Sequence, residues 1–519
     1  MSTIESAPVA TNDPSAAGRV NDLRSALALI EDDPQHFIET DHPVDPNAQL
    51  AGVYKHIGAG GTVQRPTRTG PAMRFNTITG FDDIRVIVGV LADRARVAKL
   101  LGTTSDNVNE VIAAAFDDAI QPVVVDADHA PVQEQVYLAS DEGFDIRKLL
   151  PAPTNTPKDA APFFCEGLLL GTDPETGHSD VTIHRIAVQG KDELSIFFSP
   201  GRHIEVFREK AERVGKPLPI TINMGLDPAI LVGACFEAPT TPFGYDELQV
   251  AGGLRHEAVQ LVKAKTVDEH AIARAEIVIE GELLPNERVR EDQNSDTGHA
   301  MPEFPGYNGP ANPELPVMRV TAVTTRKHPM LQTLVGPGEE HTNLAGIPTE
   351  ASVLRAVEAA NPGFVKQVYS HTSGGGKFLL VMSVHKTKAA DDGYARQAAL
   401  VALATYRELK NVILVDDDVD VFDTNDVMWA MTTRMQGNTD IIVIPGVAGH
   451  VLDPSQQPLY DPSLPAKGVT SKTIFDATAP FHMRDEMTRA QFLEVDPRPW
   501  APTLHFPEYD GIPLSDDAA

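Results

Sequence analysis

Residues 181–188 read VTIHRIAV, residues 218–224 read LPITINM and residues 275–280 read AEIVIE. These stretches alternate or run apolar and are bounded by Gly, Pro and Asp, which is the pattern of short β-strands. The region at 141–330 is therefore predicted to be a mainly β module. The proline-rich stretch LLPAPTNTPKDAAPF at 149–163 is typical of a connection between domains.

The region before this module has a different pattern. Residues 19–120 carry apolar side chains at helical spacing, as in VNDLRSALALIEDD and FDDIRVIVGVLADRARVAKLLG. They follow a loose tail of small residues at 1–18. We expect an α+β region over 19–140.

The C-terminal third predicts an α/β domain over 331–490, followed by a tail at 491–519. Thr349 is suited to cap a helix over 351–360 that ends before Pro362. A strand at 378–384, an alanine-rich helix at 394–410 and a strand at 412–415 come next, and this order is that of a parallel unit. Between the two modules, residues 290–316 are polar and rich in Gly and Pro, which indicates a long ordered loop or a mobile lid.

Composition narrows the function classes. The formal net charge of the 519 residues is −30, so no basic surface is available to neutralise nucleic-acid phosphates. No apolar run approaches the ~20 residues that a membrane helix needs. The N-terminus lacks a signal-peptide pattern, and two cysteines cannot form a disulfide framework. The cytoplasm is the expected compartment.

Three suggestive motifs do not meet their tests. HTSGGGKF at 371–378 lacks the first glycine of a phosphate loop, and Phe378 stands where Ser or Thr would bind magnesium. GAGG at 58–61 has Val63 where the last glycine of a dinucleotide fingerprint belongs. The acidic run DDDVDVFD at 416–423 fits either a cation site or a solvated turn at a strand end.

A series of short motifs identifies the chain as a relative of a known family. In order they are DVTIHR at 180–185, PGRH at 200–203, YDELQVAG at 245–252, AEIVIEG at 275–281, EFPGY at 303–307, VDDDVDV at 415–421 and WAMTTR at 429–434. Together they resemble the UbiD family of decarboxylases, which use prenylated FMN, over roughly residues 140–480. The resemblance implies that the middle module is a split β-barrel that holds the flavin and that the C-terminal domain moves and dimerises.

The resemblance also implies metal ions. In the family an Asn, a His and a Glu hold a divalent metal, usually Mn²⁺ and alternatively Mg²⁺, and the matching residues are Asp180, His203 and Glu247. Asp180 departs from the usual Asn but is still an oxygen ligand for a hard cation, and it adds negative charge beside the cofactor phosphate. A K⁺ ion would lie nearby, with Phe236 and Arg434 at the matching positions.

The family's catalytic trio is one Arg and two Glu. The resemblance places them at Arg185, Glu291 and Glu303, with Glu287 as the alternative for the first acid. Arg185 would hold a carboxylate and stabilise the ionised form of Glu291. Glu303 would deliver a proton to the ring carbon that loses CO₂, and for this its pKa should be raised by burial and a like-charged neighbour.

The resemblance extends to contacts with ligands. The residues implied to contact the prenylated FMN are Ile183, His184, Arg185, Arg202, His203, Glu237, Ala238, Pro239, Glu247 and Lys386. Those implied to face the substrate are His450, Leu452, His328 and His341. A histidine at 450 favours a heteroaromatic or hydroxylated ring, and pyrrole-2-carboxylate, a dihydroxybenzoate and phenazine-1-carboxylate are the candidates.

The implied function is the reversible, non-oxidative decarboxylation of an aromatic or heteroaromatic acid through a covalent adduct with prenylated FMN. A flavin prenyltransferase would supply the cofactor, and a homodimer or higher homo-oligomer is expected. One alternative is decarboxylation of a prenylated hydroxybenzoate in quinone synthesis, which the negative charge disfavours at anionic membranes. The other is a flavin-binding protein without turnover.

Overall fold

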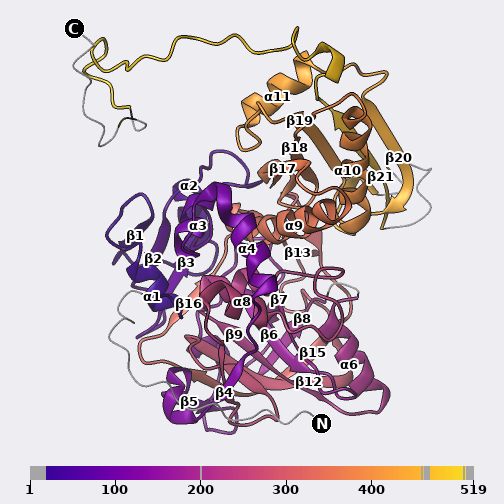
Figure 1. Ribbon diagram of the computed structural model, residues 1–519. Coiled ribbons are helices and arrows are strands. Elements are labelled where there is room, and N and C mark those ends of the chain that lie inside the picture. The colour runs from indigo at the N-terminus through magenta and orange to yellow at the C-terminus, as the bar shows by residue number, and fades with distance from the viewer. Residues whose placement is uncertain (1–18, 199–200, 457–459, 461–467, 507–508, 510–519) are drawn as a thin grey trace.

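The computed structural model describes residues 19–198, 201–456, 460, 468–506 and 509 (Figure 1). The predicted tail at 1–18 lies outside this range. Three regions follow one another along the chain, and the middle one is a barrel, so the predicted fold of an α+β region, a β-barrel and an α/β domain is confirmed. No helix among the described residues has the length and apolar character to cross a bilayer.

The N-terminal region combines short helices with a four-stranded sheet. Its elements are α1 (Leu23–Ala28), β1 (Phe37–Thr40), α2 (Gln49–Ile57), β2 (Ala72–Phe75), β3 (Arg85–Val88), α3 (Arg94–Leu100) and α4 (Val108–Asp117). The sheet order is β1-β2-β3-β16, and its last strand, β16 (Met330–Thr333), comes from beyond the barrel and pairs parallel with β3. The helical pattern predicted over 81–102 is wrong in its first half, because the β-branched residues of β3 are buried between two neighbouring strands.

The middle region is a closed six-stranded barrel. Its strands are β6 (Phe163–Thr172), β7 (Ser179–Val188), β8 (Glu193–Ile196), β9 (Leu218–Met224), β12 (Ile277–Val289) and β15 (Leu315–Thr325). They pair in the order β12-β9-β6-β7-β8-β15, and β12 pairs with β15 to close the ring, outside which β5 (Gln135–Leu138) adds to β15. In β6, a Cβ at Gly167 would lie 2.3 Å from Ile186 Cδ1 and 2.9 Å from Ile222 Cγ2, so a larger residue would force these side chains to shift.

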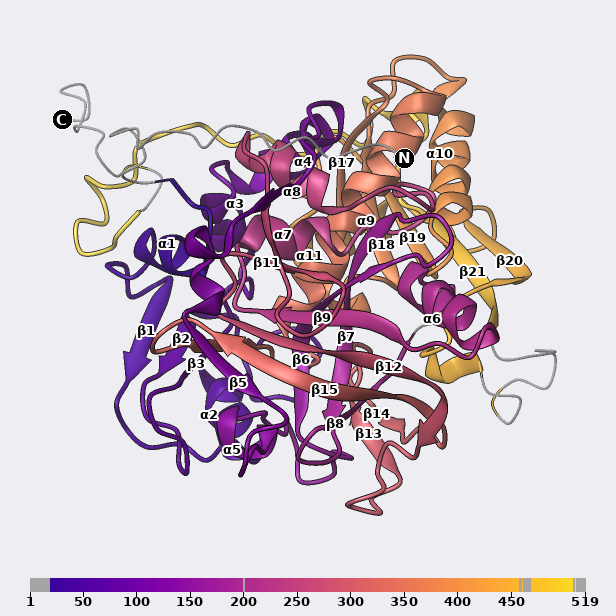
Figure 2. The ribbon, with the colours of Figure 1, turned by 90° about the horizontal axis from the view of Figure 1, so that it is seen from below.

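Helices and smaller sheets surround the barrel (Figure 2). The helices are α5 (Ile146–Leu149), α6 (His203–Arg213), α7 (Pro228–Gly233) and α8 (Leu248–Arg255). The additional strands are β4 (Val123–Val125), β10 (Gln260–Lys263), β11 (His270–Ile272), β13 (His299–Pro302) and β14 (Asn308–Pro310). Since β13 and β14 pair as a hairpin, the segment at 290–316 has ordered structure of its own.

The C-terminal region is a five-stranded sheet with helices on both faces. Its elements are α9 (Glu339–Ala360), β17 (Val365–Ser370), β18 (Leu379–Val384), α10 (Asp391–Thr405), β19 (Asn411–Asp416), α11 (Thr424–Thr433), β20 (Ile441–Ala448) and β21 (Val469–Asp476). The order is β17-β18-β19-β21-β20, with β18, β19 and β21 parallel. Apolar residues of α9 and α10 cover one face, and those of α11 cover the other.

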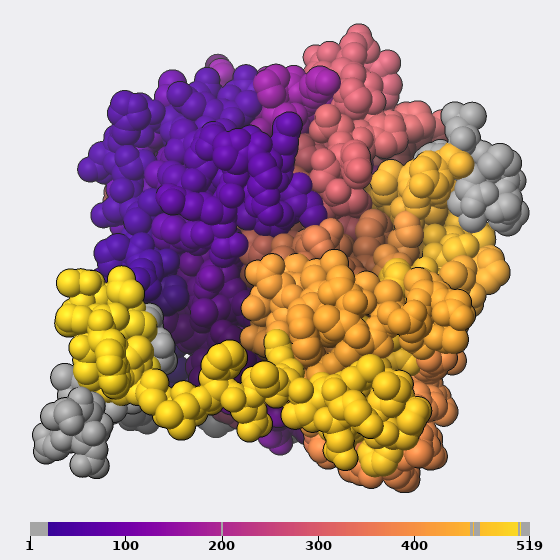
Figure 3. All heavy atoms as spheres, turned by 90° about the horizontal axis from the view of Figure 1, so that it is seen from above, coloured from indigo at the N-terminus to yellow at the C-terminus, as the bar shows by residue number. Residues whose placement is uncertain are grey.

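Two predictions for this region need correction in their bounds. Helix α9 begins at Glu339 rather than at Thr349, whose hydroxyl lies inside the helix and donates to the carbonyl of Ala345 at 2.8 Å. Helix α10 begins before residue 394 and ends at Thr405, before residue 410. After the sheet, residues 490–506 leave the domain as an extended segment, seen in yellow in Figure 3.

Candidate active site

Strand β7 carries both ends of the candidate site. Asp180 is near its start and Arg185 is five residues further on. At about 3.3 Å per residue the two Cα atoms are roughly 17 Å apart. A cluster of metal-ligand type therefore lies at one end of an elongated site, and an arginine with two carboxylates lies at the other.

The first cluster consists of Asp180, His203 and Glu247. Each offers one ligand atom, and the three atoms lie within 4.8 Å of one another, the one such group found among the described residues. Strand β7 supplies Asp180, the first turn of α6 supplies His203, and Glu247 precedes α8. His203 Nδ1 and Asp180 Oδ2 are 2.5 Å apart.

The residues of this cluster fit a divalent cation. The Oε2 atom of Glu247 is buried, and no hydrogen-bond partner for it is present in the part of the chain that the structure describes. Burial, together with the charge of Asp180, raises the pKa of Glu247 well above its usual value. Burial also raises the pKa of Asp180, against the opposing effect of His203. A bound cation would relieve this cost, and two carboxylates with one imidazole suit Mn²⁺ or Mg²⁺.

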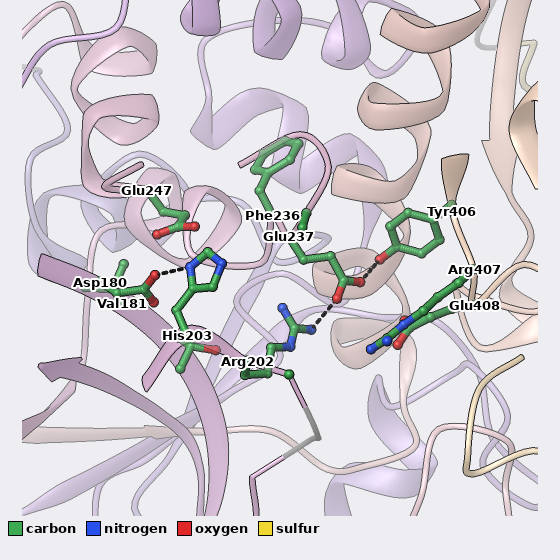
Figure 4. A pocket seen from close by; sticks show the side chains of 13 residues that line it. Asp180, Val181, Arg202, His203, Phe236, Glu237, Glu247, Tyr406, Arg407 and Glu408 are labelled. Carbon is green, nitrogen blue, oxygen red and sulfur yellow. Dashed lines mark hydrogen bonds and ion pairs between the residues drawn. The ribbon is translucent and has the colours of Figure 1, made fainter. Parts of the chain in front are cut away.

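A cavity of about 140 Å³ adjoins the cluster (Figure 4). Its wall is formed by Asp180, Val181, Thr182, Gly201, Arg202, His203, Phe236, Glu237, Ala238, Glu247, Tyr406, Arg407 and Glu408. Arg202 Nη2 lies 3.1 Å from Glu237 Oε2, and the Tyr406 hydroxyl donates to Glu237 Oε1 at 2.5 Å. The barrel and the C-terminal domain thus both contribute polar groups to this cavity.

The second cluster is built around Arg185. Its Nε and Nη2 donate to the two oxygens of Glu291 at 2.8 and 3.1 Å, and its Nη1 donates to Glu303. The guanidinium also lies over the ring of Phe197, 4.1 Å from its centroid. Glu291 accepts a further hydrogen bond from the backbone N–H of Asn312 at 2.9 Å. The arginine therefore holds two carboxyl groups in fixed positions.

The two carboxyl groups have different environments. The side chain of Glu291 is fully buried, with a bidentate cation and a backbone donor. Burial raises the pKa of Glu303, and the negative charge of Glu291 raises it further, while the positive charge of Arg185 opposes both effects. A Glu303 of raised pKa beside a Glu291 held by the same arginine is the arrangement that proton delivery requires.

Aromatic and imidazole rings pack beside Glu303. The ring of the next residue, Phe304, contacts the rings of Phe378 and His450 edge-on, each at 4.8 Å, and that of His341 at 6.1 Å. Burial lowers the pKa of both histidines to about 4, so both are neutral near pH 7. His450 Nδ1 accepts a hydrogen bond from the backbone N–H of Leu452 at 3.0 Å, and its Nε2 lies 3.3 Å from Glu408.

The structure thus brings together most of the residues predicted for the site. The flavin-contact set at the cavity comprises Arg202, His203, Glu237, Ala238 and Glu247, with Pro239 next in the chain. On β7, Ile183 packs against the core beneath the site, and His184 is buried against Phe198 with its pKa lowered by burial to about 3. Phe236 lines the same cavity.

Three predicted residues lie elsewhere. Lys386 is fully buried in the C-terminal domain, where it donates to Asp392 at 3.1 Å and to the carbonyl of Ala479. Arg434 donates to Asp416 at 3.0 Å and to Asp418. Acids of the same domain thus pair with both cations, and neither side chain lines the cavity described above.

His328 also lies apart from the site. Its side chain is 73% exposed at the far end of the barrel, with Nδ1 3.9 Å from Asp83. It lies where the chain leaves β15 and enters β16, in a left-handed conformation with φ of 50°. The acidic run at 416–423 forms ion pairs within the C-terminal domain. Asp416 and Asp418 pair with Arg434, and Asp416 also lies 3.5 Å from Lys386.

Several residues of the site were not predicted. Tyr406 and Glu408 line the cavity, and Lys377 forms an ion pair with Glu408. Lys377 belongs to the glycine-rich stretch HTSGGGKF, which fails as a phosphate loop but does lie at the site. This glycine-rich stretch is the one sequence signal that points to any of the three residues, because Tyr406 and Glu408 belong to no recognisable motif.

Comparison with known proteins identifies relatives of the chain. Three family models match, described as the N-terminal, Rift-related and C-terminal domains of 3-octaprenyl-4-hydroxybenzoate carboxy-lyase, at residues 31–116, 123–339 and 342–477. The chain is 54% identical to a gallate decarboxylase of Lactiplantibacillus plantarum, over 91% of this chain and 97% of that protein.

Solved structures show the same relationship. The apo structure of a 3,4-dihydroxybenzoic acid decarboxylase from Enterobacter cloacae is 64% identical, with a TM-score of 0.90 over 93% of this chain and 99% of that one. An evolved dimeric form of the UbiD-class enzyme HmfF from Pelotomaculum thermopropionicum, in complex with prFMN, is 30% identical, with a TM-score of 0.78 over 94% of this chain and 100% of that one. The chain therefore belongs to the UbiD family of carboxy-lyases.

Proposed function

We propose that this protein decarboxylates a hydroxylated benzoic acid of the 3,4-dihydroxybenzoate or gallate type, with prenylated FMN as cofactor and Glu303 as proton donor. The observation that carries the proposal is the Arg185 cluster, in which one buried arginine holds a charge-paired Glu291 and a Glu303 of raised pKa. The relatives named for gallate and for 3,4-dihydroxybenzoic acid support the substrate class.

Each residue of the cluster has a role in this proposal. Arg185 orients the substrate carboxylate and, through its two hydrogen bonds to Glu291, is itself held in place. Prenylated FMN, when bound, supplies the electron sink that the ring needs as CO₂ leaves. The raised pKa of Glu303 favours its protonated form, which transfers the proton to the ring carbon that has lost CO₂.

The other end of the site would hold the cofactor phosphate through a metal. Asp180, His203 and Glu247 are the proposed ligands of Mn²⁺, and Arg202 lies beside them at the cavity. A K⁺ ion at the loop of residues 236–239 remains part of this proposal, without Arg434. The prFMN complex of the UbiD-class relative supports the choice of cofactor, which a flavin prenyltransferase would supply.

The substrate end favours a hydroxylated ring. His341 is a neutral imidazole beside Phe304, and among the described residues its ring makes no hydrogen bond, so its nitrogens are available to a phenolic hydroxyl. The nitrogens of His450, in contrast, are occupied by the N–H of Leu452 and by Glu408. The relatives named for gallate and 3,4-dihydroxybenzoic acid favour a dihydroxybenzoate over pyrrole-2-carboxylate and phenazine-1-carboxylate. We also propose a homodimer, in line with the dimeric form of that relative.

The test uses protein co-expressed with a flavin prenyltransferase. We expect CO₂ release from 3,4-dihydroxybenzoate or gallate, and exchange of a ring proton of the corresponding phenol in D₂O, which reports the reverse protonation step. Pyrrole-2-carboxylate and phenazine-1-carboxylate serve as comparison acids. Protein that binds the flavin but neither releases CO₂ nor exchanges a proton with any acid of the panel would be a flavin-binding protein without turnover.

A further inference from the structure

The loop between α10 and β19 brings a cation of the C-terminal domain to the cavity. Tyr406, Arg407 and Glu408 of this loop form part of the cavity wall, together with the three residues of the metal-ligand cluster. Arg407 is exposed, and among the residues that the structure describes its guanidinium has no ion pair or hydrogen bond. In Figure 4 its side chain extends from the C-terminal domain toward the barrel side of the cavity, where Arg202 lies.

The residues on either side of Arg407 hold it at the cavity. The Tyr406 hydroxyl donates to Glu237 Oε1 at 2.5 Å, and this contact joins the loop to the barrel region. Glu408 forms an ion pair with Lys377, and the side chains of both Tyr406 and Glu408 are buried. Because the loop is fixed on both sides of it, Arg407 has only its own side chain to order when it binds a ligand.

The acids of the cavity wall have partners other than Arg407. Glu237 lies 3.1 Å from Arg202, and Glu408 is paired with Lys377. The other two acids belong to the metal-ligand cluster. A divalent metal with three protein ligands keeps open coordination positions. The metal on the barrel and Arg407 on the C-terminal domain are therefore both suited to bind an anion that enters the cavity.

We infer that Arg407 binds the phosphate group of the flavin cofactor, so that this phosphate joins the C-terminal domain to the metal on the barrel. A phosphate monoester carries up to two negative charges near pH 7, and a guanidinium binds it with charge-assisted hydrogen bonds. The inference rests on the proposed function, in that the metal-ligand cluster holds the cofactor phosphate. It adds a contact from the second domain, which the barrel alone does not provide.

The test compares FMN with riboflavin, which has the same ring system and no phosphate. The full-length protein with saturating Mn²⁺ is titrated with each flavin, and the quenching of flavin fluorescence reports binding. Arg407→Gln should weaken FMN binding about tenfold, the effect of one charge-assisted hydrogen bond, and should leave riboflavin binding unchanged. Arg407→Lys keeps the positive charge and should retain part of the FMN affinity. Unchanged FMN binding in Arg407→Gln, or an equal loss for both flavins, would overturn the inference.

A matched control separates this contact from the overall charge of the protein. The chain has a net charge of −30, so the loss of any cation makes it a poorer host for an anion. Lys366 is an exposed cation on β17 of the same domain and does not line the cavity. Lys366→Gln should bind FMN as the unmodified protein does. A loss equal to that of Arg407→Gln would attribute the effect to net charge and refute the assignment.

Two further measurements show whether the fold and the metal site of the variant are intact. Arg407 is exposed, so Arg407→Gln should keep the melting temperature of the unmodified protein. It is not among the three metal-ligand residues, so calorimetry should give the same Mn²⁺ affinity with flavin-free protein. A weakened Mn²⁺ affinity would assign the effect to the metal and overturn the inference. If Arg407 distinguishes FMN from riboflavin but no acid is decarboxylated, the proposed reaction fails and the phosphate contact stands.

Discussion

Replacing Arg185 by Met removes the cation to which both oxygens of Glu291 are hydrogen-bonded. The Glu291 side chain is fully buried, and what remains to it is the N–H of Asn312 at 2.9 Å. Removing one partner of a buried ion pair costs about 3–5 kcal/mol, because the other charge stays in a medium of low polarity. We expect the upper part of that range, since Arg185 also holds Glu303.

The effect should be visible in thermal unfolding of the barrel region. For a unit of roughly 200 residues each kcal/mol corresponds to about 2–4 °C, so Arg185→Met should lower the melting temperature by roughly 10 °C. Scanning calorimetry of the protein without flavin measures this shift. Arg319 is a matched control on the same barrel, because its pairs with Asp192 and Glu193 are 40% exposed at the arginine and contribute less than ~1 kcal/mol.

The double variant decides whether the cost comes from the buried charge. Glu291→Gln replaces the carboxylate by a neutral amide of the same shape. Combined with Arg185→Met it should recover about 2 kcal/mol relative to Arg185→Met alone, because no unpaired charge remains. If the two single effects simply add, Arg185 and Glu291 are not energetically coupled and the reasoning is wrong.

Three further predictions concern the proton donor, the metal and the C-terminal domain. Glu303→Gln should abolish CO₂ release while the purified protein retains its flavin absorbance, and full activity of the variant would mean that another group donates the proton. In the unmodified enzyme, kcat should fall as pH rises through the raised pKa of Glu303, because only the protonated acid donates. Adding Mn²⁺ at 100 times its Kd should stabilise the flavin-free protein by ~2.7 kcal/mol in calorimetry, and Asp180→Ala should remove that gain; an equal gain in the variant would show that the metal binds elsewhere. Arg434→Met should cost about 3 kcal/mol of stability, because it leaves the buried Asp416 with only the more distant Lys386 as a cation. Flavin affinity in a fluorescence titration should be unchanged, whereas a weakened affinity would return Arg434 to the predicted K⁺ site beside the flavin.

Local sequence pattern and the order of motifs predict the structure of some parts of the molecule and not of others. The spacing from Asp180 to Arg185 survives folding because both lie on one strand, whose geometry is fixed by its sequence separation. The sequence of β3 predicts a helix wrongly, because a short apolar run fits a helix or a buried strand equally well. The pairing that decides between them involves residues some 240 positions away.

Long-range ion pairs were the least predictable feature. Lys377 and Glu408 meet across 31 residues, and the Tyr406 hydroxyl reaches Glu237 across 169. Arg434 matches a family motif, yet in the fold it pairs with Asp416 and Asp418 and does not line the cofactor cavity. A motif identifies residue types, while packing between domains decides which charges meet.

The order of strands in the N-terminal sheet determines when this sheet is able to fold during synthesis. The fourth strand, Met330–Thr333, leaves the ribosome only after the whole barrel has been synthesised, and until then β3 has one unpaired edge. Val86, Ile87 and Val88 are fully buried in the finished protein, so the nascent N-terminal region exposes an apolar strand edge that is prone to pairing with other chains. A fragment ending before the barrel keeps that edge open permanently, and a protein cut there should aggregate rather than fold as a separate domain.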